Sequence, residues 1–341
     1  MHLKIIFSIF LVSVLIPISC GPISDLRTIA DLDYHPPVMN GIETEDAQKL
    51  VIRFNEKASI ITGSINILPK ISIESVTTNE ESIILQFQET QTPGQEYILE
   101  AAVRDEKENS MNFMTKFYGF NPNIPQLCIN EFITQGSGKH PDLVELYVLT
   151  PGNMAGICMY EGTPDTWDDK MVFPPFNVNK GDYILVHFKP QGIPEEINET
   201  EAKNKSGGYD ASPEAFDFWL KNGTGLSGNN GVLSIYSNPH GKILDGVLYS
   251  NRTSASDDQY RGFGSKDVLA MAEELVEDKG WIIRGDLVAP EDAVNPTGST
   301  ATRSLCRSSR SDDSDSSQDW HIVPTSTSTF GSRNSDAVYT P

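Results

Sequence analysis

Acidic residues near the C-terminal end of the chain have a composition that could serve a metal ion. Asp312, Asp313, Asp315 and Asp319 lie close together in the sequence, and calcium takes about six to eight oxygen ligands. The cluster lacks the glycine at the sixth position and the glutamate at the twelfth that an EF-hand requires. Asp and Ser also favour turns through their own hydrogen bonds. A polar hairpin loop is therefore the preferred interpretation, and a calcium site is the alternative.

Two glutamates form a second candidate. Glu131 and Glu145 fall in neighbouring runs that read as strands, so they could form an acid pair for metal binding or general acid–base work. The simpler interpretation is that they face solvent, or pair with a lysine or a turn amide, as ordinary parts of a sheet. We expect no catalytic residue here.

Cysteine and histidine give no recognisable chemical motif. Beyond Cys20 the chain has Cys128, Cys158 and Cys306, an odd number that leaves at least one thiol unpaired within the chain. A disulfide between Cys128 and Cys158 and a pair of buried thiols both remain open. The histidines are scattered without zinc-ligand spacing.

Short β-rich runs must position these residues. Four of them lie between Leu127 and Lys189, separated by breaks that contain Gly, Pro or Asp, which is the pattern of strands and turns. Earlier in the chain, at 33–121, six or seven similar runs follow one another at the spacing of a β-sandwich. These runs include 50–54, 64–68, 71–76, 82–87, 97–103 and 113–117.

Two stretches of the second half predict helices. In 212–220, Ser212 as N-cap, Pro213 at the first helical position and Asn222-Gly223 as a stop predict a two-turn helix. Its residues at i, i+3 and i+4 would dock on the sheet, which leaves Phe218 as the candidate contact for a partner. In 265–279, apolar residues fall on one face at helical spacing, so this helix should lie against the sheet.

The order of elements in the second half is more specific than any single run. In chain order the elements are Ile129-Asn130-Glu131, Val144–Tyr147, Gly181-Asp182-Tyr183, Gly231–Tyr236, Arg303–Arg307 and Gly331–Asn334. This series resembles the lamin-tail domain, an immunoglobulin-like β-sandwich of nuclear lamins and of bacterial secreted or surface proteins. The resemblance implies a lamin-tail-like domain at 126–336, with insertions at about 191–227 and 252–300.

The first half carries another resemblance. Val51–Glu56, Pro93–Tyr97 and the pair Asp105 and Asn109 are similar to bacterial Ig-like domains of S-layer-type surface proteins. The expected fold class is therefore all-β, with two tandem Ig-like β-sandwiches, the second carrying helical insertions.

The N-terminus predicts export. Met1–Lys4 precede an apolar run from Ile5 to Ile18, which is typical of a signal peptide and shorter than the roughly 17–25 residues of a membrane span. Cys20 resembles the acylated cysteine of a bacterial lipobox, with Pro17 where leucine is preferred. We expect a signal peptide at 1–19, a tether at 20–32 and a lipid on Cys20. An ordinary secretory peptide that leaves Cys20 as a thiol is the alternative.

The net charge of the chain limits the classes of partner that we expect. The formal net charge of −21 repels phosphate backbones, so nucleic acid is not an expected ligand. The sequence favours a lipid-anchored protein of the cell envelope, periplasmic or on the outer-membrane surface, with a non-enzymatic binding or scaffolding role. Its expected partners are a membrane and a protein or polysaccharide ligand. No cofactor is expected, and calcium is the alternative. The alternatives are an envelope hydrolase of the nuclease or phosphatase type, which the resemblance suggests, and a metal-dependent adhesin.

Overall fold

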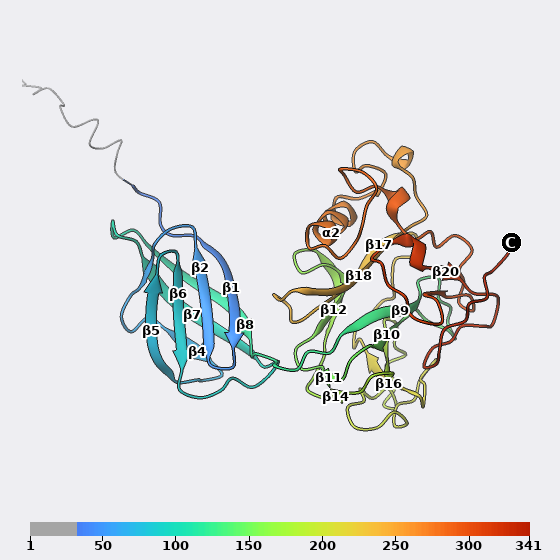
Figure 1. Ribbon diagram of the computed structural model, residues 1–341, viewed down its shortest axis with the longest axis horizontal. Coiled ribbons are helices and arrows are strands. Elements are labelled where there is room, and N and C mark those ends of the chain that lie inside the picture. The colour runs from blue at the N-terminus through green and yellow to red at the C-terminus, as the bar shows by residue number, and fades with distance from the viewer. Residues whose placement is uncertain (1–32) are drawn as a thin grey trace, which may run out of the picture.

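The computed structural model describes residues 33–341, and the expected signal peptide and the lipidation site Cys20 lie outside this range. The described chain is mostly β and forms two lobes, residues 33–121 and 126–341, joined by a short linker (Figure 1). One α-helix and several short 3-10 turns interrupt the strands of the second lobe. No helix in residues 33–341 is long and apolar enough to cross a membrane.

The first lobe has two antiparallel sheets on one apolar core. One sheet has the order β1 (Met39–Asp46), β2 (Lys49–Phe54), β6 (Ser82–Phe87) and β5 (Ile73–Asn79). The other contains β3 (Ser59–Ile60), β7 (Glu96–Arg104) and β4 (Asn66–Leu68), and β8 (Ser110–Tyr118) also pairs with β7. Alternate residues of β2 and β6 point into the core, where Leu50, Ile52 and Leu85 have no exposed surface. The runs predicted at 50–54, 64–68, 71–76, 82–87, 97–103 and 113–117 correspond to β2, β4, β5, β6, β7 and β8, whereas β1 and β3 were not predicted.

The second lobe is built from two larger sheets and a short two-stranded one. The six-stranded sheet has the order β16 (Ala215–Trp219), β15 (Tyr183–His187), β10 (Leu143–Val148), β9 (Leu127–Ile133), β19 (Leu305–Cys306) and β20 (His321–Ile322). The four-stranded sheet has the order β13 (Trp167–Val172), β12 (Cys158–Gly162), β17 (Asn230–Tyr236) and β18 (Ile243–Ser250). The short sheet pairs β11 (Gly152–Asn153) with β14 (Asn177–Val178). One large apolar cluster spans both larger sheets.

The helix predicted in 265–279 is confirmed. It is α2 (Lys266–Glu277), whose N-cap Ser265 accepts a hydrogen bond from the backbone of Val268. Met271 and Leu275 are buried against the second lobe, and burying each such side chain contributes about 1.5–3 kcal/mol. Three 3-10 turns complete the described elements: η1 (Ser254–Ser256), η2 (Pro290–Asp292) and η3 (Ser317–Asp319).

The helix predicted in 212–220 is wrong. Its central residues form β16, which pairs in parallel with β15. Phe216 and Phe218 face the core, while Asp217 on the opposite face meets His187. Both faces of the segment are therefore buried, and a strand with a period of two places the aromatic side chains better than a two-turn helix does.

Candidate functional site

A buried arginine is the centre of the acidic cluster. Arg307 follows β19 directly and has no exposed surface. Its Nη1 donates to Asp313 Oδ1 at 2.7 Å and to Asp319 Oδ2 at 3.3 Å, and its Nη2 lies 3.4 Å from both carboxylate oxygens of Asp245. The guanidinium also stacks 4.8 Å from the centre of the Trp320 ring. The carboxylates therefore hold the cation of a side chain.

The predicted calcium ligands do not all lie together in the structure. Asp313 and Asp315 come within 4.8 Å of Asp245, so the structure does bring part of the set together. Asp312 turns away and accepts from Ser308 and Arg310. Because Arg307 already occupies the contacts of Asp313 and Asp319, the geometry fits an internal ion-pair network rather than a set of ligands free for an ion.

Asp245 is the most buried carboxylate of the network. Burial raises its pKa to about 7, while Arg307 and the backbone N–H groups of Ile129 and Gly246 act to lower it. The two N–H donors lie 2.6 and 2.7 Å from its oxygens. Loss of the arginine would leave a carboxylate in the protein interior with no cation beside it.

The glutamate pair lies on the same sheet, on the face opposite its core. Glu131 and Glu145 are direct cross-strand partners on β9 and β10, and neither has any exposed surface. Burial raises the pKa of both, and the charge of Glu131 raises that of Glu145 further. The expectation that they face solvent is wrong.

Donors from the C-terminal segment saturate this pair. Ser304 and both the backbone and the hydroxyl of Thr329 donate to Glu131. The backbone of Gly331 donates to Glu145 at 2.6 Å, and Asn130 Nδ2 donates to it at 2.7 Å. The pair thus holds Thr329 and Gly331 against the sheet. This agrees with the interpretation that the glutamates pair with a turn amide.

A histidine and an aspartate meet at the other end of the sheet. His187 Nε2 lies 2.8 Å from Asp217 Oδ1, and the indole of Trp219 stacks on the imidazole at 3.7 Å between ring centres. Within residues 33–341, Nδ1 of His187 is buried without a hydrogen-bond partner. A catalytic triad needs a nucleophile bonded to the free imidazole nitrogen, and the described part of the chain places none there.

The predicted partner contact does not lie on the surface. Phe218 is fully buried and packs against Phe173 and Phe176, with ring centres 5.0 and 5.2 Å apart. The proposal that it contacts a partner is therefore wrong, because β16 turns it into the core. Cys128, Cys158 and Cys306 are buried free thiols, so the buried-thiol alternative describes them.

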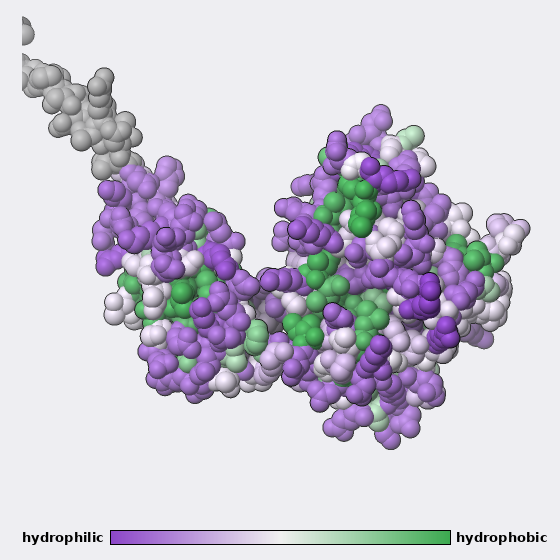
Figure 2. Space-filling model, viewed as in Figure 1, coloured by the Kyte–Doolittle hydropathy of each residue, from purple (hydrophilic) through white to green (hydrophobic). Residues whose placement is uncertain are grey.

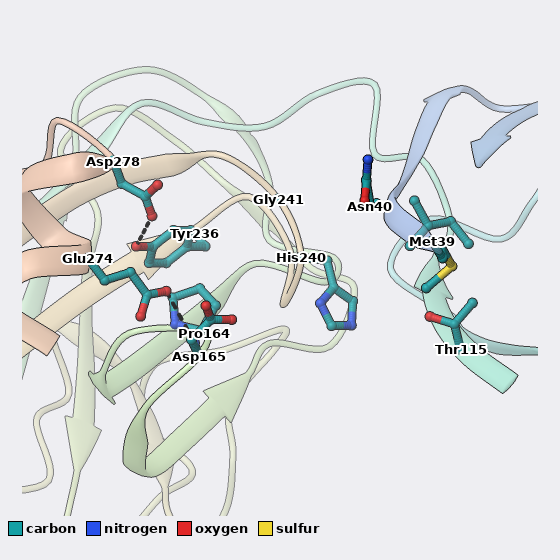
Figure 3. Close-up of a pocket in the computed structure, with 12 residues that line it drawn as sticks. Met39, Asn40, Thr115, Pro164, Asp165, Tyr236, His240, Gly241, Glu274 and Asp278 are labelled. Atoms are coloured by element: carbon teal, nitrogen blue, oxygen red, sulfur yellow. Dashed lines mark hydrogen bonds between the residues drawn. The ribbon is translucent and has the colours of Figure 1, made fainter. Parts of the chain in front are cut away.

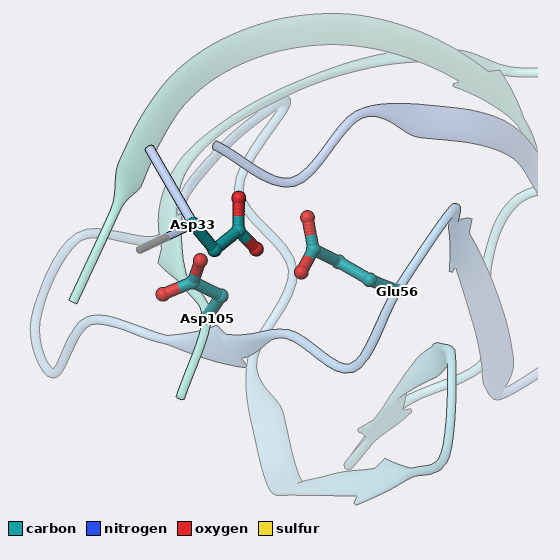
Figure 4. Close-up of side chains that lie close together, drawn as sticks. All are labelled: Asp33, Glu56 and Asp105. Carbon is teal, nitrogen blue, oxygen red and sulfur yellow. The ribbon is translucent and has the colours of Figure 1, made fainter. Parts of the chain in front are cut away.

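A third carboxylate cluster lies at one end of the first lobe (Figure 4). Asp33, Glu56 and Asp105 approach within 4.8 Å of one another. Asp105 accepts from the backbone of Lys107 and Asn109 and from Asn109 Nδ2 at 2.7 Å. Burial disfavours its charge, but these donors outweigh burial and hold its pKa below the ordinary value. This is the aspartate–asparagine turn that the sequence predicted between β7 and β8.

The two lobes touch through backbone at their junction. Gly94 and Gly156 have φ of +70° and +81°, and a Cβ on Gly94 would come within 2.4 Å of the Gly156 nitrogen. Asn121 Nδ2 donates to the carbonyls of Asn153 and Ala155, at 2.7 and 3.0 Å. Because only glycine allows so close an approach at both turns, this contact fixes the lobes at one end.

Beyond the junction the lobes diverge and leave a cleft between them (Figure 2). Two adjoining cavities of about 390 and 480 Å³ share residues 40–42, 240 and 241. Asn40 and Ile42 of β1 line one wall, while Tyr236 and Glu274 line the other. Figure 3 shows His240 standing between these two walls. The cleft is thus built from both lobes, at positions far apart in the sequence.

The wall formed by the second lobe is acidic. Asp165, Glu274 and Asp278 line it (Figure 3), and none of them has an ion-pair partner among residues 33–341. Glu274 accepts from the Thr163 hydroxyl at 2.6 Å, and Asp278 accepts from the Tyr236 hydroxyl at 2.6 Å. No local pattern in the sequence connects Asp165 with Glu274 and Asp278, because the first lies in a loop and the other two lie at the C-terminal end of α2.

The boundary between the lobes also appears in a comparison with known families. A family described as "protein second domain" matches residues 125–322. The chain belongs to this family. The match to the protein second domain family begins at the linker and runs from β9 to β20, so it includes the Arg307 network, the glutamate pair and the acidic wall of the cleft.

The lamin-tail resemblance is corrected by this match. The second lobe belongs to the protein second domain family, and nothing in the comparison indicates a lamin tail. Short β-branched runs separated by glycine turns are needed by any antiparallel sheet. The elements from Ile129 to Asn334 therefore could not distinguish one β family from another.

A relative shares much of the chain. An uncharacterized protein of Treponema pallidum (strain Nichols) is 26% identical over 215 residues, which cover 62% of this chain and 54% of that protein. The chain thus spans about half the length of this relative.

Proposed function

We propose that this chain is an exported, non-enzymatic binding protein of the cell envelope, held to a membrane by a lipid on Cys20. In this proposal its lobes are two tandem Ig-like β-sandwiches, and the ligand occupies the cleft between them. The observation that carries the proposal is that both lobes line the cleft while the glycine contact at the junction sets their spacing. Sites formed between domains are common places for ligands to bind.

The state of the other polar clusters supports a binding role. Glu131, Glu145 and Asp245 are saturated by donors from within the lobe. The free nitrogen of His187 has no nucleophile bonded to it among the described residues. These groups hold segments of the chain together, whereas the carboxylates of the cleft face a cavity.

The experiment that tests the binding site fills the cleft. Asn40 is exposed on β1 and lines both cavities, so Asn40→Trp should obstruct them. The matched control is Val76→Trp on β5, at the opposite edge of the same sheet, where the residue is 42% exposed. The mature chain and both variants are immobilised and exposed to envelope extract of the organism that makes the protein, and the retained molecules are identified by mass spectrometry.

The proposal predicts a set of molecules retained by the mature chain and by Val76→Trp and lost with Asn40→Trp. Equal retention by Asn40→Trp would mean that the cleft is not the binding site. Turnover of a retained molecule by the mature chain would contradict the non-enzymatic role.

The anchor is tested separately at Cys20. Two or three acyl chains bury several tens of CH₂ groups at about 0.8 kcal/mol each, which suffices for stable membrane association. Cys20→Ala should therefore abolish incorporation of a labelled fatty acid and release the chain from the membrane fraction. A mutant that stays in the detergent phase with unchanged mobility would contradict the lipid anchor.

A further inference from the structure

Strand β1 presents an unpaired edge to the cleft. Within residues 33–341, β1 pairs only with β2, and its register with β2 is regular from Gly41 to Thr44. These same residues line the cleft. Figure 1 places β1 on the side of the first lobe that faces the second lobe, and β5 on the far side. A free strand edge offers a row of N–H and C=O groups that can pair with another extended backbone.

The opposite wall carries three carboxylates that form no ion pair within residues 33–341. Glu274 and Asp278 lie at the C-terminal end of α2, where the helix dipole already disfavours negative charge. The last turn of α2 contains no basic residue. The hydrogen-bond donors to Glu274 and Asp278 are neutral, and the Asp165 carboxylate accepts no hydrogen bond from the described part of the chain.

The electrostatics of Glu274 agree with this geometry. Burial raises its pKa, and the nearby charges of Asp165 and Asp278 raise it further, against the donors from Thr163 and the Asp165 backbone. A cation placed between the three carboxylates would relieve this repulsion.

We propose, on the basis of the binding function above, that the cleft takes an extended peptide that adds to β1 as a strand and directs a lysine or arginine side chain to Asp165, Glu274 and Asp278. The β1 edge supplies backbone pairing that tolerates many sequences, and the acidic wall selects the basic residue. A neutral polysaccharide fits less well, because it offers no cation and no strand backbone. The tyrosine on this wall, Tyr236, is buried and bonded to Asp278 rather than free to stack on a sugar.

The probe is a library of random twelve-residue peptides displayed on phage and selected on the mature chain. A selected peptide is synthesised and its affinity is measured by fluorescence anisotropy, beside a version with norleucine in place of its lysine. Asp165→Asn removes one charge from the wall. Glu74→Gln, on exposed β5, makes the same change of charge outside the cleft.

Selection should enrich lysine or arginine at one position, and Asp165→Asn should weaken binding by about tenfold, which corresponds to about 1.4 kcal/mol. Norleucine in the peptide should weaken it at least as much, and Glu74→Gln should leave it unchanged. Hydrogen exchange should show that the bound peptide protects amides of Gly41–Thr44 and leaves β5 unaffected. Strand addition requires this asymmetry between the two edges of the sheet.

Three results would contradict the proposal that the ligand is a peptide. They are a library that yields no binder, a norleucine peptide that binds as well as the lysine peptide, and binding without protection of β1. The proposed function would still stand if Asn40→Trp abolished retention from envelope extract. If the mature chain retained an oligosaccharide and Asn40→Trp abolished this retention, the ligand would be a saccharide and not a peptide. If Asn40→Trp changes neither retention nor peptide binding, the proposed function and the peptide both fail.

Discussion

Carboxylates occupy two opposite settings in the second lobe. Around Arg307, Asp245, Asp313 and Asp319 lie within 3.4 Å of one buried guanidinium. On the wall of the cleft, Glu274 and its neighbours have only neutral donors and face a cavity. The first group has an arginine of the same chain beside it, and the second has no ion-pair partner within residues 33–341.

The difference separates stability from recognition. A buried carboxylate with its cation removed is strongly destabilising, because the remaining charge stays in the interior. A partly exposed carboxylate without a cation costs the fold little and attracts a cationic ligand.

The largest effect is expected at Arg307. Arg307→Met leaves Asp245 buried without its cation, so it should lower the free energy of unfolding by about 3–5 kcal/mol. Arg310→Ala is the matched control, since Arg310 forms an exposed pair with Asp312, and exposed pairs contribute about 0–1 kcal/mol. Denaturant unfolding of both variants at pH 7 measures the two losses. Equal small losses would mean that Arg307 is not the centre of the network.

An intermediate effect is expected at Glu161, a buried carboxylate without a cation. Burial raises its pKa to about 7, and the charges of Asp168, Asp169 and Asp142 add to the rise. The folded state therefore binds this proton more tightly than the unfolded state does. The stability that the group contributes is complete below its ordinary pKa near 4.5 and is lost as the pH rises through about 7.

Glu161→Gln removes this ionisation and can still accept the hydrogen bond from the Ser227 backbone. The variant should be more stable than the original chain at pH 8 by about 1–3 kcal/mol, and this gain should vanish near pH 4. Unfolding measured at several pH values tests the slope. A parallel pH dependence in both proteins would assign the raised pKa to the wrong group.

The smallest effect is expected from calcium. Because Arg307 already holds Asp313 and Asp319, calcium and a chelator should leave the melting temperature unchanged. A site saturated a hundredfold over its Kd would add about 2.7 kcal/mol. Asp286 is exposed and lies outside the cluster, so Asp286→Asn is the control. A calcium-dependent rise of several degrees, lost in Asp313→Asn and retained in Asp286→Asn, would show that the acidic cluster binds an ion.

The sequence predicted correctly those elements that are set by the order of apolar and polar residues within one segment. The runs at 50–54 and 82–87 predicted β2 and β6, and the apolar face of 265–279 predicted α2. The segment 212–220 failed because capping signals are weaker than pairing with β15 and burial of both faces.

The candidate site could not be predicted in the same way. Asp245 and Arg307 are separated by 62 residues, and no spacing rule connects them. The cleft depends on contacts between Gly94 and Gly156 and on the end of α2, which faces β1 across the cavity only in the folded chain. Composition indicated an acidic protein, but it could not show which carboxylates lack a cation.

The pKa of Glu274 would report directly whether a cationic ligand binds beside the cleft carboxylates. Glutamate carrying ¹³C at its carboxyl carbon reports the pKa of each residue by NMR, and Glu274→Gln assigns the signal. In the free protein the pKa of Glu274 should stand above its ordinary value, and it should fall when the selected lysine peptide is bound, while its norleucine version leaves it raised. If the pKa of Glu274 were the same in the free protein and with the lysine peptide bound, the lysine would not lie beside the cleft carboxylates.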